Sequence, residues 1–144
     1  MGSIVGMDNE FMTVSCDPES GIVQHVMHRF VISAIFREGL EAGLKLLAAH
    51  GATKWLSDDR NNGPLSGDDA EWVATSWRPR AIAAGLVHWA LVMPDHVFGR
   101  MRLRRHVTAA REAGLVVETF EDAKVALGWL ESQPRRLQLP RAPR

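Results

Sequence analysis

Acidic residues follow three stretches of this sequence that read as β-strands. These residues are Asp58-Asp59-Arg60, Asp95-His96 and Glu121-Asp122. In open α/β sheets, ligands bind outside the carboxyl ends of the strands, so these side chains could line one rim of a sheet. Carboxylates near a histidine can act as acid and base or bind a metal ion. One hypothesis is therefore a small enzyme, with metal assistance as an option, that uses Asp58, Asp59 and His96.

Acids that follow strands also cap helices and form turns, because their side chains accept hydrogen bonds from backbone N–H groups. Asp95 and Asp122 stand where helix caps belong, so capping is the better interpretation for both. Asp59 and Arg60 are harder to explain in this way. We predict that they form either a structural ion pair or a clamp for a ligand.

The remaining metal-ligating and nucleophilic residues form no recognisable site. His25 and His28 are three apart on an expected strand, so their side chains point to opposite faces and do not favour one metal. Cys16 lies in an expected strand and is interpreted as a buried, inert thiol. There is no Gly-rich phosphate loop and no Gly-x-Ser-x-Gly elbow. We predict no metal site and no cofactor.

The chain has five tryptophans and no tyrosine, and one tryptophan stands apart. Core packing explains Trp77 and Trp89, whereas Trp72 falls off the apolar stripe of its expected helix, as residues at an interface or pocket mouth often do. Pro79 breaks the same helix, so the segment could move over an apolar cavity. The predicted ligand- or partner-binding residues are Asp59, Arg60, Trp72, Trp77, Arg78 and His96.

The elements that must position these residues alternate along the chain. An opening hairpin is expected over 11–16 and 21–30, because Asp17-Pro18-Glu19-Ser20-Gly21 between them is rich in turn residues. Ser33 is expected to cap a helix that ends at Gly51, and Ser66 to cap a helix with a kink near Trp77-Arg78. The other expected elements are strands over 54–58, 86–93 and 115–120 and helices over 95–113 and 121–132.

This order predicts an α/β fold: a mixed sheet of about five strands covered by about four helices. The nearly continuous apolar run from Leu86 to Met93 is typical of a central strand with parallel neighbours. A length of 144 residues suits one domain. We expect a flexible N-terminus over 1–10, one α/β domain over 11–133, and a disordered tail rich in Pro and Arg over 134–144.

The charge distribution and the cysteine content restrict the classes of partner and the cellular compartment that we expect. The chain is neutral overall, but residues 134–144 hold four arginines and no acid, so the rest of the chain is acidic. An acidic body argues against nucleic-acid binding. The single cysteine suits a reducing compartment. No basic stretch followed by an apolar run opens the chain, and no apolar run approaches the ~20 residues of a membrane span, so we expect a cytoplasmic protein without a transmembrane segment.

Several spaced stretches between about Phe11 and Leu130 look like one family. They are Lys54-Trp55-Leu56-Ser57-Asp58-Asp59-Arg60, Trp72 through Trp77-Arg78-Pro79-Arg80-Ala81, Ala84-Gly85-Leu86, Phe120-Glu121-Asp122 and Ala126-Leu127-Gly128-Trp129-Leu130. On these stretches the chain resembles the SpoIIAA-like, STAS-type domains of bacteria, and among them a branch of stand-alone small proteins. The resemblance implies a STAS-type fold and a regulatory or interaction module.

The resemblance implies two different kinds of function, regulation of a protein partner and binding of an apolar ligand. Some STAS-type domains are anti-sigma-factor antagonists that are switched by phosphorylation of a serine in an Asp-Ser-Ser/Thr-Gly turn after the central strand. Here that stretch reads Asp58-Asp59-Arg60-Asn61-Asn62-Gly63, which argues against switching by phosphoserine. Proteins of the related CRAL-TRIO fold bind apolar ligands. The leading hypothesis is thus a non-enzymatic regulatory or ligand-binding module, a homodimer, that binds a protein partner or a small apolar or anionic ligand.

Trp72 supplies a test of the interface-or-pocket hypothesis. Truncating a tryptophan buried against a second subunit or a ligand costs about 3–5 kcal/mol. We therefore expect Trp72→Ala to change the mass measured by light scattering or the binding of an apolar dye. A variant that melts at a lower temperature but keeps the wild-type mass and dye response would restrict Trp72 to packing within its own domain.

Overall fold

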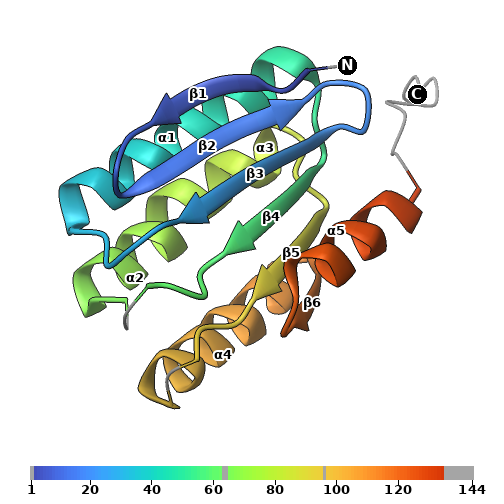
Figure 1. The fold of residues 1–144 in the computed structure, drawn as a ribbon. Helices are drawn as coiled ribbons and strands as arrows, with labels where there is room; N and C mark the ends of the chain where they lie inside the picture. Colours follow the sequence, from blue (N-terminus) through green and yellow to red (C-terminus); the bar gives the residue numbers. More distant parts are fainter. Residues whose placement is uncertain (1, 63–64, 96, 135–144) are drawn as a thin grey trace.

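The protein folds into a six-stranded mixed sheet with helices on both faces (Figure 1). The computed structural model describes residues 2–62, 65–95 and 97–134. The strands, which lie in the sheet in sequence order, are β1 (Ile4–Asp8), β2 (Met12–Asp17), β3 (Ile22–Met27), β4 (Lys54–Asp58), β5 (His88–Val92) and β6 (Val116–Phe120). The first three strands pair antiparallel, and β3 to β6 pair parallel.

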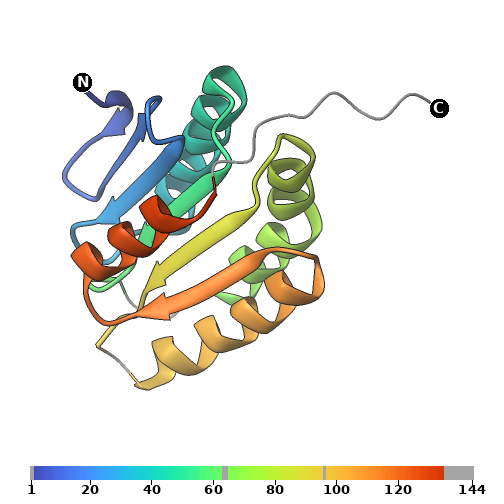
Figure 2. The same ribbon diagram turned by 90° about the vertical axis from the view of Figure 1, so that its right-hand side faces the viewer.

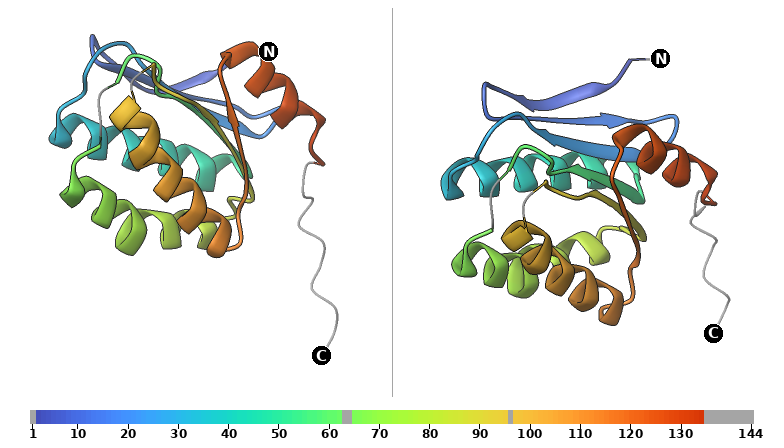
Figure 3. Two further views of the ribbon diagram at one scale, coloured as in Figure 1. Left: turned by 90° about the horizontal axis from the view of Figure 1, so that it is seen from below. Right: turned by 60° about the horizontal axis from the view of Figure 1, so that its bottom comes forward.

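The helices divide unequally between the two faces of the sheet (Figures 2 and 3). They are α1 (Ser33–His50), α2 (Gly67–Trp72), the π-helical turn η1 (Val73–Trp77), α3 (Arg78–Ala83), α4 (Val97–Glu112) and α5 (Ala123–Ser132). Parallel crossovers are right-handed and the strand order runs in one direction, so the helices between β3 and β6 share one face. Among the helices of the described residues, only α5, after the last strand, lies on the other face. No helix in the described ranges is long and apolar enough to cross a membrane.

The predicted fold class is confirmed, with one strand more than expected. The additional strand, β1, lies in the segment 1–10 that was predicted to be a flexible N-terminus, and that prediction is wrong there. Its side chains are mostly exposed, so the apolar alternation that marks a strand is weak. A turn at Asn9, whose Oδ1 accepts hydrogen bonds from the backbone N–H groups of Phe11 and Met12, instead directs β1 onto β2. The predicted disordered tail lies outside the described residues from 135 onward.

The predicted break in the helix that contains Pro79 is confirmed and takes the form of η1. Proline lacks an N–H group and cannot pair with the carbonyl of Thr75. The preceding turn widens, and the Arg78 N–H donates to the carbonyl of Val73, five residues back. Trp77 and Arg78 are consecutive, yet both are buried on the side of the sheet and α4.

Of the four helix N-caps expected from the sequence, those at Ser66 and Asp122 are confirmed and that at Ser33 is wrong. The cap expected at Asp95 adjoins residue 96, which lies outside the described residues, and stays a prediction. Ser66 caps α2 by accepting a hydrogen bond from the Asp69 N–H, and Asp122 caps α5. Ser33 is not a cap: α1 begins after Ile32, and the Ser33 hydroxyl donates to the Asp69 carboxylate at 2.6 Å. This hydrogen bond does not cap α1, but it joins the start of α1 to the start of α2.

Close approach of α1 to the sheet requires glycine at position 43. A Cβ atom there would collide with the indole of Trp55, which is buried beneath the helix. We expect Gly43→Ala to lower the free energy of unfolding by about 1–3 kcal/mol, because enlarging a packed position forces side chains out of their rotamers. Denaturant unfolding measures the change.

The matched control is Gly128→Ala in α5, where an added Cβ meets no atom within 4 Å. Alanine should stabilise that exposed helical position by about 0.5–1 kcal/mol. Equal effects of the two substitutions would contradict the packing of Trp55 on Gly43.

Candidate functional site

A cavity of about 70 Å³ lies between the sheet and the three helical segments that cover its main face. Side chains of β3, β4 and β5 form one wall. Helices α1 and α4 and the η1–α3 segment form the others, and Asp59, Asn62 and Leu65 after β4 complete the lining. The side chains that line the cavity are His25, Phe36, Leu40, Trp55, Ser57, Asp59, Asn62, Leu65, Val73, Trp77, Arg78, Trp89, Leu103 and His106.

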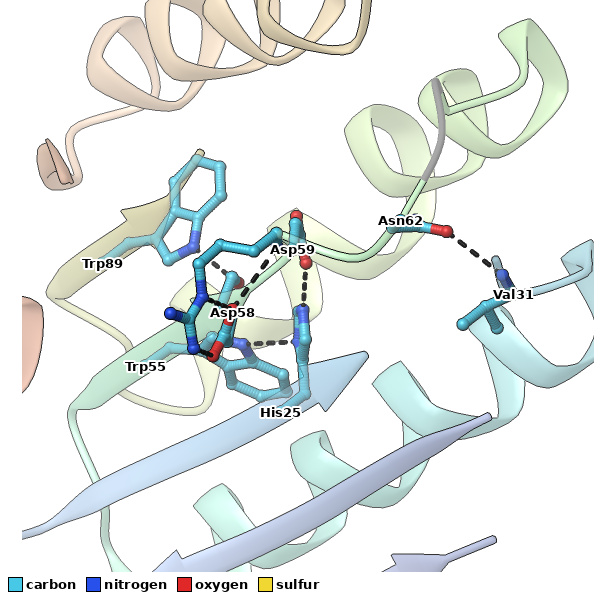
Figure 4. Close-up of polar contacts among 9 residues, drawn as sticks. His25, Val31, Trp55, Asp58, Asp59, Asn62 and Trp89 are labelled. Carbon is cyan, nitrogen blue, oxygen red and sulfur yellow. Dashed lines mark hydrogen bonds and ion pairs between the residues drawn. The ribbon is translucent and has the colours of Figure 1, made fainter. Parts of the chain in front are cut away.

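A buried chain of hydrogen bonds fixes the carboxylate of Asp59 at this cavity (Figure 4). The indole N–H of Trp55 donates to Nδ1 of His25 at 3.1 Å. Nδ1 is therefore the acceptor nitrogen, and Nε2 carries the ring proton and donates it to Asp59 Oδ1 at 2.8 Å. The second carboxylate oxygen, Oδ2, accepts no hydrogen bond from the described residues. His25 thus orients Asp59 and leaves one oxygen available.

Asp58 lies on the opposite face of the sheet, because successive side chains of a strand alternate. Its carboxylate accepts hydrogen bonds from Nε and Nη2 of Arg60 at 3.0 and 2.8 Å. The hydrogen bonds and the charge of Asp58 raise the pKa of the Arg60 guanidinium. The predicted ion pair of Arg60 therefore exists, but its partner is Asp58 and not Asp59.

Arg78 contributes a positive charge to the cavity wall, and no carboxylate of the described residues pairs with it. The residue is only 6% exposed. The one hydrogen bond of its guanidinium among the described residues runs from Nη2 to His106 Nδ1 at 3.3 Å. Burial lowers the pKa of the Arg78 guanidinium below its usual value, since desolvation disfavours the charged form. Arginine nevertheless stays protonated in proteins, so the cavity holds a full positive charge.

Three tryptophan rings line the cavity, and their N–H groups are already engaged within the protein. The Trp77 indole N–H donates to the carbonyl of Leu40 and the Trp89 N–H to the hydroxyl of Ser57, both at 2.8 Å. The rings of Trp55 and Trp77 meet edge to face with their centres 4.9 Å apart. These rings offer a ligand apolar surface, while Arg78 and Asp59 supply charge.

A groove on the outer surface meets the cavity at Arg78 and His106. It runs between the α2–η1 segment and α4 and measures about 260 Å³. Its lining includes three alanines, a glycine, Arg102 and Arg105, and no acidic residue is among the described residues that line it. This basic groove is a route by which an anion can approach Arg78.

The structure brings together half of the residues predicted for the site. Asp59, Trp77 and Arg78 line the cavity. Arg60 is on the other face, and His96 lies outside the described residues. Trp72 packs edge to face on Phe36 with the Arg37 guanidinium over its ring, and it is not among the cavity-lining residues.

His25, Trp55 and His106 were not predicted for the site. The sequence did contain an indication of the role of His25. This residue shares a strand face with Val23 and Met27, and a histidine on an apolar face needs a buried hydrogen-bond partner. His106 had no comparable signal, because the apolar stripe of its helix is ragged. Within the described part of the chain, no cluster of three or more His, Cys, Asp or Glu side chains could hold a metal ion.

No family model matches this sequence, and no curated protein or solved structure is significantly similar to it. The STAS-type family therefore stays a prediction from the sequence.

His106 should make stability depend on pH. Burial, together with the nearby charge of Arg78, lowers its pKa below the usual 6.5, and Asp59 opposes this. Below pH 6.5 the unfolded chain therefore binds more protons than the folded one at this site, and the free energy of unfolding falls as the pH falls. We expect His106→Gln to flatten that fall in urea unfolding series recorded from pH 7 down to about pH 5.

Thr108→Gln is the control and should keep the wild-type slope, because Thr108 is an exposed residue of the same helix, carries no titratable group and does not line the cavity. A wild-type slope in both variants would contradict a lowered pKa at His106.

Proposed function

We propose that this chain is a non-enzymatic ligand-binding module of STAS type whose cavity binds a small anion with an apolar body. The observation that carries the proposal is Arg78, a buried guanidinium in an aromatic cavity with no carboxylate partner among the described residues. A ligand carboxylate would supply the missing charge.

The energetics of burial support this role for Arg78. Removing an ion from water costs several kcal/mol even after the protein relaxes, and a paired counter-charge normally offsets that cost. His106 accepts a hydrogen bond from Arg78 but brings no negative charge. A carboxylate can take two parallel hydrogen bonds from a guanidinium, which gives both energy and orientation. The cost of burying Arg78 is then recovered when the ligand binds.

The shape and chemistry of the cavity support an apolar body for the ligand. Trp55, Trp77 and Trp89 have their N–H groups satisfied within the protein, so their rings present carbon to the cavity. Ligand pockets commonly combine such walls with a few polar groups that fix orientation. The basic groove beside Arg102 and Arg105 favours the approach of anions over cations.

The other functional predictions have less support. A homodimer and a regulatory protein partner stay predictions, and the Trp72→Ala experiment tests them. An enzyme built on Asp58, Asp59 and His96 has no observation in its favour, because Asp58 and Asp59 lie on opposite faces of the sheet and Asp58 is held by Arg60.

Arg78→Met separates a binding role from a structural one. We expect acetate, propionate and butyrate to raise the melting temperature of the wild-type protein and to change the fluorescence of its cavity tryptophans. Arg78→Met keeps the length of the side chain and removes its charge, so carboxylate affinity should fall at least about tenfold. Because an uncompensated buried charge disappears, the unliganded variant should melt at or above the wild-type temperature.

Arg104→Met is the matched control. Arg104 is an exposed residue of α4 outside the lining of both cavity and groove, so the substitution removes the same charge and should leave binding unchanged. Wild-type affinity in Arg78→Met would exclude Arg78 as the anion site. A protein that binds none of the carboxylates would overturn the proposed function.

A further inference from the structure

The cavity contains a second buried charge, opposite in sign to Arg78. Asp59 is 8% exposed and Arg78 is 6% exposed, and both line the cavity. The described residues form no ion pair between them: Asp59 bonds to His25, and Arg78 bonds to His106. Opposite charges buried at one cavity would ordinarily pair, because pairing offsets the desolvation of both. Here each contacts a histidine instead.

The position of Asp59 is fixed by several contacts that do not involve a ligand. Its backbone N–H donates to the carbonyl of Val92, and its own carbonyl accepts from the N–H of Asn62. Oδ1 is held by His25, which is held in turn by Trp55. A carboxylate held this firmly, with Oδ2 unused by the described residues, is a preorganised acceptor. The strongest partner for such an acceptor is a positively charged donor.

Resting on the proposed function, we infer that the ligand is a small amino acid, whose carboxylate pairs with Arg78 and whose ammonium group pairs with Asp59. The aromatic rings contact the carbon atoms between the two charges. A cavity needs about 10–15 Å³ for each water-sized centre, so a cavity of about 70 Å³ suits roughly five to seven non-hydrogen atoms. Glycine, alanine, β-alanine and 4-aminobutyrate fall in this range.

The same two charges explain how the site rejects related molecules. A simple carboxylate satisfies Arg78 but leaves Asp59 without a cation, and a simple amine leaves Arg78 without an anion. A site built around buried polar groups discriminates strongly against ligands that leave one of them unpaired. Selectivity therefore comes from the pair of charges, and the spacing between them selects the length of the ligand.

Isothermal titration of the full chain with matched ligand pairs tests this inference. The pairs are β-alanine with propionate and 4-aminobutyrate with butyrate, which differ by one amino group; glycine, alanine and propylamine complete the set. We expect at least one amino acid to bind about tenfold or more tightly than its carboxylate partner, and propylamine not to bind measurably. 3-Hydroxypropionate, which replaces the ammonium of β-alanine by a neutral hydroxyl, should bind no better than propionate.

Asp59→Asn provides the matched variant, since the amide keeps the shape of the side chain and removes its charge. It should abolish the preference for the amino acid while keeping carboxylate affinity within about threefold, whereas Arg78→Met should weaken both ligands. If Asp59→Asn fails to fold, the ligand pairs on the wild-type protein decide the question alone.

Two failures can be told apart. Carboxylates that bind through Arg78 as tightly as every amino acid of the set would overturn the amino-acid inference and leave the proposed function standing. So would 3-hydroxypropionate that equals β-alanine, where β-alanine is the preferred amino acid. Absence of binding by every carboxylate and amino acid would overturn both.

Discussion

The indole of Trp55 is the contact on which the cavity depends. It lies against the backbone of α1 at Gly43, where any Cβ atom would collide with it, and its edge meets Trp77. From this position its N–H reaches His25 and thereby selects which ring nitrogen bears the proton. That proton holds Asp59 in the loop after β4. One packed tryptophan therefore joins the core to the polar end of the cavity.

The two neighbouring aspartates illustrate how strand alternation assigns different roles to identical residues. Asp58 faces the α5 side of the sheet, where Arg60 neutralises it in a bidentate ion pair. Asp59, one residue later, enters the cavity and meets a neutral histidine. The first carboxylate is fully compensated within the protein. The charge of Asp59 is compensated only in part, because its histidine partner is neutral. For this reason we assign a ligand group to Asp59.

The π-helical turn before Pro79 has a comparable consequence on the other wall. The wide turn is a departure from regular helix that a sequence would not keep for helix stability alone, and such turns occur often at functional sites. It precedes Arg78, which is buried without a counter-ion among the described residues, and that burial is also unfavourable for stability. Local structure and packing that are less stable than the alternatives are expected where function constrains the chain. Both departures here border the same cavity.

The sequence by itself determined the α/β class, most element positions, the break at Pro79 and three members of the cavity, because apolar periodicity, turn residues and proline act locally. It missed β1, whose exposed side chains carry little apolar pattern, and it assigned Ser33 to a cap when its hydroxyl reaches Asp69. Only the tertiary structure placed His25 beside Asp59, 34 residues away, and Arg78 beside His106, 28 residues away. Such pairs depend on strand register and helix packing over long separations, which no local pattern of residues encodes.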